Sequence, residues 1–432
     1  MIKLDYGKEG IDITLDPEWN VTVFKPSKQK PIENPIQKIK DSLNKPIGSL
    51  NLKEIIKKKG KIKSVCIIAS DATRPVPSHL ILEALIAELN IYGIADKQIT
   101  ILIATGLHRT SHEDELERIL GENLKNRIKV VDHIATNDNS LIKIGVIGNS
   151  HPVLINELYY IADLRILTGY VEPHFFFGFA GGRKSLVPGI AGAETIQYNH
   201  SAENIASPSA RFGIYKENPL HKHSSETSKK VRADFIVNVC INEEHKIIQV
   251  ASGDFEKAHE KLVDFQLKHI FREINKPYDI VICGNGGYPL DLNLYQAVKS
   301  MAIGEMAAKK GGTLISVNEC AEGVGIGQDK FKDLIFSGMT PKEIYEKILN
   351  KEIVVPDQWE IQILARILMK ADIYVISKLN EKEIGNIGLK YAKTVENAIK
   401  NCLGKYGSDA SILILPNGPQ ILPLLKDRKN ID

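Results

Sequence analysis

The chain lacks any apolar run that approaches the ~18 residues needed for a membrane-spanning helix. Its first ten residues, MIKLDYGKEG, also lack the apolar core of a secretory signal. We therefore expect a cytoplasmic protein with no membrane partner.

Cysteine is scarce and odd in number, with five residues in 432. The five are widely spaced and lie mostly inside apolar runs, which is typical of buried thiols in a reducing compartment. They are Cys66, Cys240, Cys283, Cys320 and Cys402. The pattern argues against a disulfide framework and against a thiolate metal site.

Charge of one sign is not concentrated anywhere either. The net charge is only +3, and the sequence has no basic stripe with interleaved aromatic residues, so we expect no nucleic-acid partner. A hydrophobic content of 43% with 25% charged residues is typical of a folded protein. The length predicts about two or three domains.

Short apolar runs alternate with helical patterns, which indicates an α/β fold. Strands are predicted at 63–70, 99–106, IKVVDH, LRILTGY, DIVICG, TLISVNE, DIYVISK and SILILPNG, with a helix at 78–92. Segment 232–251 predicts a hairpin, so at least one sheet should be mixed rather than purely parallel.

A change in composition near FREINKPYDIVICG places a domain boundary at about 270–277. We expect an N-terminal α/β domain at 1–272 and a C-terminal α/β domain at 273–432. The last ~20 residues could fold back on the N-terminal domain.

Four loops that follow predicted strands carry many reactive side chains, and ligands of open α/β sheets bind at the carboxyl ends of strands. These loops contain SDATRP, GLHR, HFFFGFAGGRKS and LYQAVKS. Their candidate residues are Asp71, Thr73, Arg74, His108, Arg109, Glu172, His174, Arg183, Lys184, Tyr295, Gln296 and Lys299.

Each candidate also has a purely structural interpretation. Asp71 and Thr73 could cap the next helix, and a single histidine at a strand end is more often a hydrogen-bonded structural residue. Arg109 and Lys299 could be solvated surface charges, and FFF is typical of core packing. Convergence at the carboxyl ends of strands favours the functional interpretation.

The segment GFAGGRKS suggests a phosphate-binding loop but departs from the Walker A spacing. Counting from Gly178, that motif needs a second glycine where the chain has Arg183. Lys184 could instead be a phosphate clamp, a Schiff-base amine or a covalent tether. His200 in QYNH could be a metal ligand, but one histidine does not hold a metal alone.

Taken together, SDATRP, GLHR, HFFFGFAGGRKSLVPG, QYNH and YQAVKS resemble the signature segments of the nickel-dependent lactate racemases. The resemblance covers essentially the whole chain. It implies an isomerase, a 2-hydroxyacid racemase or epimerase, whose cofactor is a pyridinium-3-thioamide-5-thiocarboxylic acid mononucleotide. Two sulfurs and a ring carbon of this nickel-pincer nucleotide hold the nickel. Lys184 would be its covalent tether and His200 the fourth nickel ligand.

The resemblance also implies a mechanism, in which hydride leaves the α-carbon to give a 2-keto acid and returns on the opposite face. His108 and His174 would be the two bases, one for each enantiomer. The cofactor would be bound by Asp71, Thr73, Arg74, Gly181 and Gly182, and the substrate by Arg74, Tyr295, Gln296 and Lys299. The active site is expected in the interdomain cleft, and cofactor-maturation proteins are expected partners.

Two other functions stay open from the residues: a nucleotide-dependent kinase or ligase using GGRKS, and a binding protein for an anionic metabolite. Among racemase substrates, lactate and slightly larger 2-hydroxy acids are equally compatible, because one methylene is worth only ~1–3 kcal/mol in an apolar pocket. Trp359 could pack near the substrate, but a position in the core or on the surface is equally compatible with its sequence context. Oligomeric state is not encoded in any pattern of the sequence.

Overall fold

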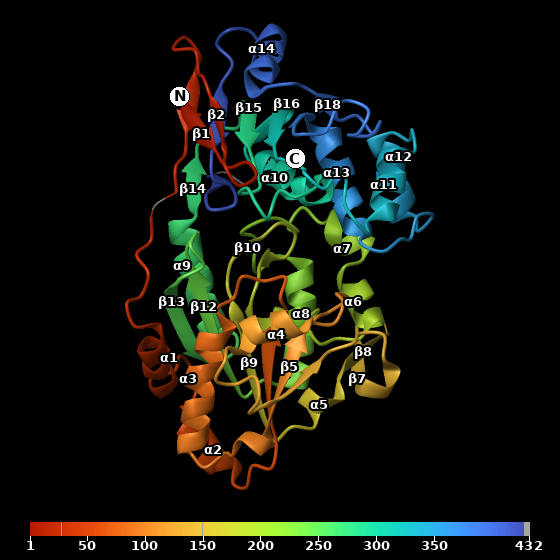
Figure 1. Cartoon of the computed structure of the whole chain (residues 1–432). Helices are drawn as coiled ribbons and strands as arrows, with labels where there is room; N and C mark the ends of the chain where they lie inside the picture. Colours follow the sequence, from red (N-terminus) through yellow and green to blue (C-terminus); the bar gives the residue numbers. More distant parts are fainter. Residues whose placement is uncertain (27, 149, 427–432) are drawn as a thin grey trace. The chain divides into compact units, whose positions relative to one another are not determined.

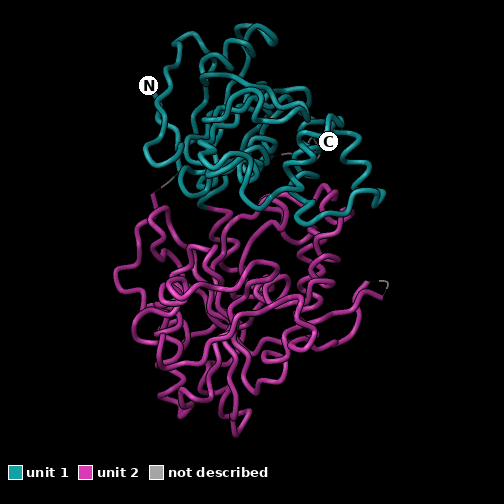
Figure 2. Tube along the Cα trace, turned by 45° about the vertical axis from the view of Figure 1, so that its right-hand side comes forward, with its two compact units in different colours: residues 1–27, 269–432 teal, residues 28–268 magenta. Residues whose placement is uncertain are grey.

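The structure, a computed structural model, describes residues 1–26, 28–148 and 150–426 (Figure 1). It divides into two compact units, which Figure 2 distinguishes by colour. Unit 1 contains residues 1–27 and 269–432, and unit 2 contains residues 28–268. Each unit has its own six-stranded sheet, so the predicted pair of α/β domains with parallel and mixed sheets is confirmed. No helix in the described part is long and apolar enough to span a membrane.

The sheet of unit 2 has the strand order β13-β12-β9-β4-β5-β6. Neighbouring strands are parallel except β12 and β13, which form the antiparallel hairpin expected at 232–251. The strands are β4 (Val65–Ser70), β5 (Ile99–Ala104), β6 (Lys129–Asp132), β9 (Leu164–Tyr170), β12 (Phe235–Ile241) and β13 (Ile247–Gly253). Continuous apolar sequences such as VCIIAS in β4 are typical of strands buried on both faces.

Helices and short hairpins complete unit 2. The helices are α1 (Pro35–Asn44), α2 (Leu52–Lys59), α3 (Ser78–Ile91), α4 (Glu113–Leu120), α5 (Glu157–Tyr160), α6 (Ala193–Asn199), α7 (Ala202–Ala206), α8 (Pro219–Val231) and α9 (Lys257–His269), with 3₁₀ turns η1 (Asp96–Gln98), η2 (Asp138–Ser140) and η3 (Gly182–Ser185). β7 (Leu141–Ile147) pairs with β8 (His151–Asn156), and β10 (Pro173–His174) with β11 (Gly178–Phe179). In α3, Leu82, Leu85 and Leu89 are fully buried in the core. Burial of each contributes about 1.5–3 kcal/mol.

The sheet of unit 1 is wholly parallel, in the order β18-β17-β16-β15-β19-β3. Its strands are β3 (Val21–Val23), β15 (Tyr278–Cys283), β16 (Ala308–Val317), β17 (Asp372–Ile376), β18 (Lys390–Tyr391) and β19 (Ile412–Leu415). The helices are α10 (Leu294–Glu305), α11 (Asp329–Ile335), α12 (Pro341–Leu349), α13 (Gln358–Lys370) and α14 (Val395–Tyr406). Ile280 and Ile282 of β15 share a core cluster with Val395 and Ile399 of α14.

Both ends of the chain belong to unit 1, which differs from a division into 1–272 and 273–432. β1 (Ile2–Leu4) pairs with β2 (Ile11–Ile13), and β3 extends the sheet by pairing with β19. At the other end, β20 (Leu422–Leu425) pairs with β14 (Phe271–Ile274), so this segment stays in unit 1. The physical reason is strand pairing, because an edge strand is placed by its partner rather than by its neighbours in sequence.

Each sheet has one point at which the strand order reverses. In unit 2 the chain runs from β4 to β5 and β6 on one side, and then continues through β9 and β12 on the other side of β4. In unit 1 the same reversal separates β15 from β19. The loops that leave the carboxyl ends at such a point diverge, and ligands bind there in open α/β sheets.

Candidate active site

The loop after β4 holds Asp71 against the loop after β5. Asp71 is 7% exposed, and its Oδ2 lies 2.7 Å from Nδ1 of His108 while its Oδ1 accepts a 2.8 Å hydrogen bond from the Thr73 hydroxyl. Burial would raise the pKa of Asp71, but the His108 hydrogen bond and the charges of His108 and Arg74 outweigh it and lower this pKa. Asp71 therefore orients His108. Neither Asp71 nor Thr73 caps α3, whose N-cap is Pro77.

His174 ends β10, and the FFF triplet forms the turn that joins β10 to β11. The backbone N–H of Phe177 donates to Nδ1 of His174 at 3.3 Å. The rings of His174 and Phe176 are in edge-to-face contact, with their centroids 4.6 Å apart. The imidazole is thus held by the turn that follows it.

The Phe177 ring lies at the centre of three candidate residues. The ammonium nitrogen of Lys184 is 4.5 Å from its centroid, and the imidazole centroids of His174 and His200 are 6.0 and 6.1 Å away. Phe177 is fully buried, so it is a fixed platform and not a mobile side chain. Lys184 comes from η3 and His200 follows α6, so three separate segments meet at this ring.

His200 is held as a neutral imidazole of defined tautomer. Burial, reinforced by the nearby Lys184 charge, lowers its pKa to about 3. Its Nδ1 donates to the backbone carbonyl of Ile196 at 3.2 Å, which leaves the Nε2 lone pair to act as acceptor or metal ligand.

Arg183 is a buried part of the loop and not an exposed clamp. It is 2% exposed, and its guanidinium donates to backbone carbonyls of the 177–181 turn at 2.9–3.4 Å. Its Cζ lies 5.1 Å from the ring centroid of Phe177 and 5.2 Å from that of Tyr215, so the guanidinium makes a cation–π contact with each ring. Arg183 therefore fixes the turn beneath Lys184.

Gly181 and Gly182 have φ of +78° and +58°, which favours glycine. A Cβ on Gly181 would lie 2.6 Å from the carbonyl oxygen of Tyr170, and one on Gly182 would lie 2.7 Å from the His259 ring. The N–H of Gly182 donates to Oδ1 of Asn238 at 2.9 Å. The turn and its close packing thus already require both glycines.

Tyr295, Gln296 and Lys299 lie on α10, which follows the loop after β15 in unit 1. The Asn293 side chain caps the helix by accepting from the backbone N–H of Gln296 at 3.0 Å. The Lys299 ammonium donates to Oε1 of Gln296 at 2.5 Å, so the two side chains form one polar group on the first turns of the helix. Burial raises the pKa of Tyr295, which keeps its phenol protonated.

Within unit 2 the structure brings the sequence-predicted residues into two groups: Asp71, Thr73 and His108 in one, and His174, Lys184 and His200 in the other. Arg74 is exposed and acts on Asp71 through its charge. Arg109 lies outside both groups, in an ion pair with Glu115 at 2.7 Å. The sequence indicated no role for Phe177 beyond packing, because a run of three identical rings does not show which one faces polar groups.

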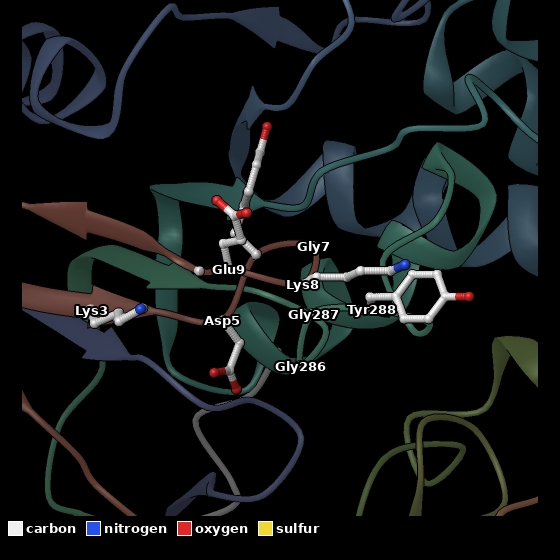
Figure 3. Close-up of a pocket in the computed structure, with 10 residues that line it drawn as sticks. Lys3, Asp5, Gly7, Lys8, Glu9, Gly286, Gly287 and Tyr288 are labelled. Atoms are coloured by element: carbon white, nitrogen blue, oxygen red, sulfur yellow. The ribbon is translucent and has the colours of Figure 1, made fainter.

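Unit 1 has a cavity of about 540 Å³, and none of the predicted site residues lines it. It is formed by the N-terminal segment and the loop after β15 (Figure 3). Lys8 lies over the ring of Tyr288 there, with 4.7 Å between the nitrogen and the ring centroid. In residues 1–26, 28–148 and 150–426, no three His, Cys, Asp or Glu side chains gather as a metal site. A metal at His200 would thus need further ligands from elsewhere.

Comparison with known proteins agrees with this organisation. A family model described as lactate racemase N-terminal domain matches residues 6–213, and one described as lactate racemase C-terminal domain matches residues 274–422. A lactate racemase from Lactiplantibacillus plantarum is 38% identical over 423 residues, covering 96% of this chain and 98% of its own length. One from Thermoanaerobacterium thermosaccharolyticum is 37% identical over 426 residues, covering 98% of each.

The fold gives the same result. The solved lactate racemase apoprotein from Thermoanaerobacterium thermosaccharolyticum matches with a TM-score of 0.90 at 36% identity, over 98% of this chain and 99% of that one. A Thermotoga maritima protein of 22% identity shares the fold, with a TM-score of 0.66 over 90% of this chain and 98% of its own. The chain belongs to the lactate racemase family and is an isomerase of the racemase class.

Proposed function

We propose that the chain interconverts D- and L-lactate, or a closely related short 2-hydroxy acid, by removing hydride from the α-carbon and returning it to the opposite face. The observation that carries this proposal is the placement of His174, Lys184 and His200 around the Phe177 ring. Names of the relatives support lactate as the substrate.

We further propose that the nickel-pincer pyridinium mononucleotide is the cofactor, attached to Lys184 and delivered by maturation proteins in the cytoplasm. The residues fit this group: Lys184 offers a primary amine, and His200 offers a neutral Nε2 ligand, fixed by its bond to Ile196. Nickel(II) accepts imidazole in a square-planar set of donors. When bound, the cofactor supplies the remaining nickel ligands and a ring that accepts and returns hydride.

The two proposed catalytic histidines are held by different groups. Nδ1 of His108 lies 2.7 Å from Oδ2 of Asp71, and Nδ1 of His174 accepts from the backbone N–H of Phe177 at 3.3 Å. In each ring Nε2 is left to exchange a proton with the substrate hydroxyl. One histidine would take the hydroxyl proton of one enantiomer and the other that of its mirror image, each returning it in the opposite direction of the reaction.

The substrate carboxylate needs cationic and hydrogen-bonding partners. We propose that Lys299, with Gln296 and Tyr295, binds it, and that Arg74 contributes from the loop after β4. Asp71, Thr73, Gly181 and Gly182 remain proposed as cofactor-binding residues.

The geometry does not favour the two other functions. In a phosphate loop the lysine follows a concavity of backbone amides at the start of a helix. Here the buried Arg183 guanidinium fills the turn, and only the four-residue η3 follows. Arg183 is also too deeply buried to clamp an anionic metabolite.

The test is turnover of protein produced together with the cofactor-maturation machinery, measured on each enantiomer of a panel of 2-hydroxy acids by chiral analysis. Active protein should carry an added mass on Lys184, absent in Lys184→Ala. His200→Ala should lose nickel, whereas His108→Ala and His174→Ala should keep nickel and lose racemisation. Active protein with an unmodified Lys184 would show that Lys184 is not the covalent tether. Full nickel occupancy in His200→Ala would show that His200 is not a nickel ligand.

A further inference from the structure

The turn that carries Lys184 contains a buried cation without a carboxylate partner. Arg183 is 2% exposed, and it forms no ion pair with an Asp or Glu of the described residues. Burial lowers the pKa of the Arg183 guanidinium to about 10, so the group stays charged at neutral pH. A buried charge without a counter-ion is costly, and an apolar side chain of similar volume would fill the space with less loss of stability. The cost points to a role for the hydrogen bonds of Arg183.

Those hydrogen bonds connect the residue before Lys184 to the ring over which Lys184 lies. Nη2 of Arg183 donates to the backbone carbonyls of Phe177 and Phe179 at 3.4 and 2.9 Å. Nη1 donates to the carbonyl of Gly181 at 3.3 Å. The Lys184 ammonium is 4.5 Å from the centroid of the Phe177 ring. Arg183 therefore holds the backbone of the residue whose ring contacts the Lys184 ammonium.

His259 of α9 holds this turn from another part of the chain. It is 1% exposed, and its Nε2 lies 2.8 Å from the carbonyl oxygen of Ala180 and 3.1 Å from Nη1 of Arg183. Its Nδ1 lies 3.1 Å from the hydroxyl of Tyr215. Burial and the Arg183 charge lower the pKa of His259 well below its usual value, so the ring is neutral. Because the Tyr215 hydroxyl can donate or accept, either tautomer bonds Tyr215 through one nitrogen and the turn through the other.

The imidazole also packs directly against the glycine of the turn. A Cβ on Gly182 would lie 2.7 Å from the His259 ring. His259 thus contacts Ala180, Gly182 and Arg183, which immediately precede Lys184 in the sequence. The position of this turn therefore depends on one side chain of α9.

We propose that His259 is a positioning residue for attachment of the cofactor, and that it places the Lys184 amine by holding the turn of Arg183. Thioamide formation joins the Lys184 nitrogen to a thiocarboxyl carbon of the cofactor and releases water, with no oxidation or reduction. The reacting atoms must approach to about 3–3.5 Å, so a displacement of the turn by about 1 Å slows attachment. This role rests on the proposed tethering of the cofactor to Lys184.

The experiment matures the full-length chain with the cofactor-maturation proteins and measures, by peptide mass at an early time, the fraction of chains modified on Lys184. His259→Phe keeps a ring but removes both nitrogens, and it should lower this fraction about tenfold. His259→Gln, whose amide can still donate to the Ala180 carbonyl, should restore part of the loss. Tyr215→Phe removes only the hydroxyl and keeps the ring on Arg183, so it should fold and lower the fraction about threefold.

His133→Phe is the matched control, because His133 of unit 2 is also 1% exposed and has partners of the same kinds. Its Nε2 lies 2.9 Å from the carbonyl oxygen of Ala191, and its Nδ1 lies 3.1 Å from Nδ2 of Asn156. Both histidine-to-phenylalanine variants should lower the thermal midpoint of the unmodified chain by about 3–10 °C. Only His259→Phe should lower the modified fraction.

A modified fraction within about twofold of wild type in both His259→Phe and Tyr215→Phe overturns the role of His259. If His259→Phe does not fold, the result for Tyr215→Phe decides alone. An equal loss of modification in His133→Phe also overturns the role, because any buried histidine would then have the same effect. Active wild-type protein with an unmodified Lys184 overturns the tether itself, on which this role depends.

Discussion

Both carboxylate oxygens of Asp71 are engaged, one by the Thr73 hydroxyl and the other by Nδ1 of His108. Asp71 therefore has two effects. It selects the tautomer of His108, and its ionised carboxylate stabilises the folded protein. An asparagine at this position could donate its amide hydrogen to Nδ1, which would move the imidazole proton to Nε2 and remove the base.

We predict that Asp71→Asn lowers kcat by about 10²-fold or more and lowers the free energy of unfolding by about 1–2 kcal/mol near pH 7. The pKa of Asp71 is lowered in the folded state, so its stabilising effect is complete above the unfolded pKa of about 3.9 and is lost as pH falls through the folded value. Denaturant unfolding of both proteins from pH 7 to pH 2 measures this. A stability difference that stays constant or grows with acidification would contradict the ionised state of Asp71.

Sequence reasoning proposed His108, His174, Lys184 and His200 as site residues because each lies in a distinctive motif. It could not show that Glu360 is buried, because a glutamate on an amphipathic helix has the same sequence context whether it faces solvent or the core. For the same reason it could not show that Arg183 is buried. Burial of a charge depends on tertiary neighbours that no local pattern encodes.

The hairpin β10–β11 and the turn that follows are the element on which His174 and Lys184 depend. Gly178, which pairs with His174 in this hairpin, has φ of +79°, and a Cβ there would lie 1.9 Å from the carbonyl oxygen of Ile214. Gly93 has a similar φ of +88°, but a Cβ on it would meet nothing within 4 Å. A substitution at Gly93 therefore tests backbone strain alone, whereas one at Gly178 tests strain together with a steric clash.

Gly93→Ala should cost only the strain of a left-handed alanine, about 1–2 kcal/mol. Gly178→Ala should cost about 3 kcal/mol or more, because the hairpin must also move away from Ile214. The Gly178→Ala variant should also lose racemase activity, whereas the Gly93→Ala variant should keep it. Thermal unfolding and turnover of the two variants test this, and equal destabilisation would show that the hairpin is not tightly packed there.

Elements with long apolar runs were predictable, and very short strands were not. The central strands β4, β5, β9 and β12 were expected from continuous apolar sequence and are confirmed. β3 has only three residues, and its partner β19 lies almost the whole length of the chain away. A pairing of this kind depends on the completed sheet and leaves no periodic signal.

At the scale of the whole molecule, each unit has its own sheet and its own buried core. The proposed catalytic histidines, the cofactor lysine and the nickel ligand all belong to unit 2, and the α10 residues to unit 1.

We predict that a fragment of residues 28–268 folds by itself and unfolds cooperatively, because its sheet and core are complete. Matured with the cofactor machinery, it should acquire the added mass on Lys184 but should not racemise lactate. A fragment of residues 1–268 is the control: its β3 should stay unpaired, since the fragment lacks β19. Circular dichroism, amide-resolved NMR and intact mass measure these outcomes, and an unfolded 28–268 fragment would show that unit 2 requires unit 1.

The pairing of β3 with β19 also has a consequence for how the chain is made. A ribosome makes β3 (Val21–Val23) long before β19 (Ile412–Leu415). Residues 28–268 can fold meanwhile, since domains generally fold as they are completed. β3 must therefore wait for its partner strand while the residues between them are made, and its insertion at the edge of the unit 1 sheet is a late step in folding of the newly made protein.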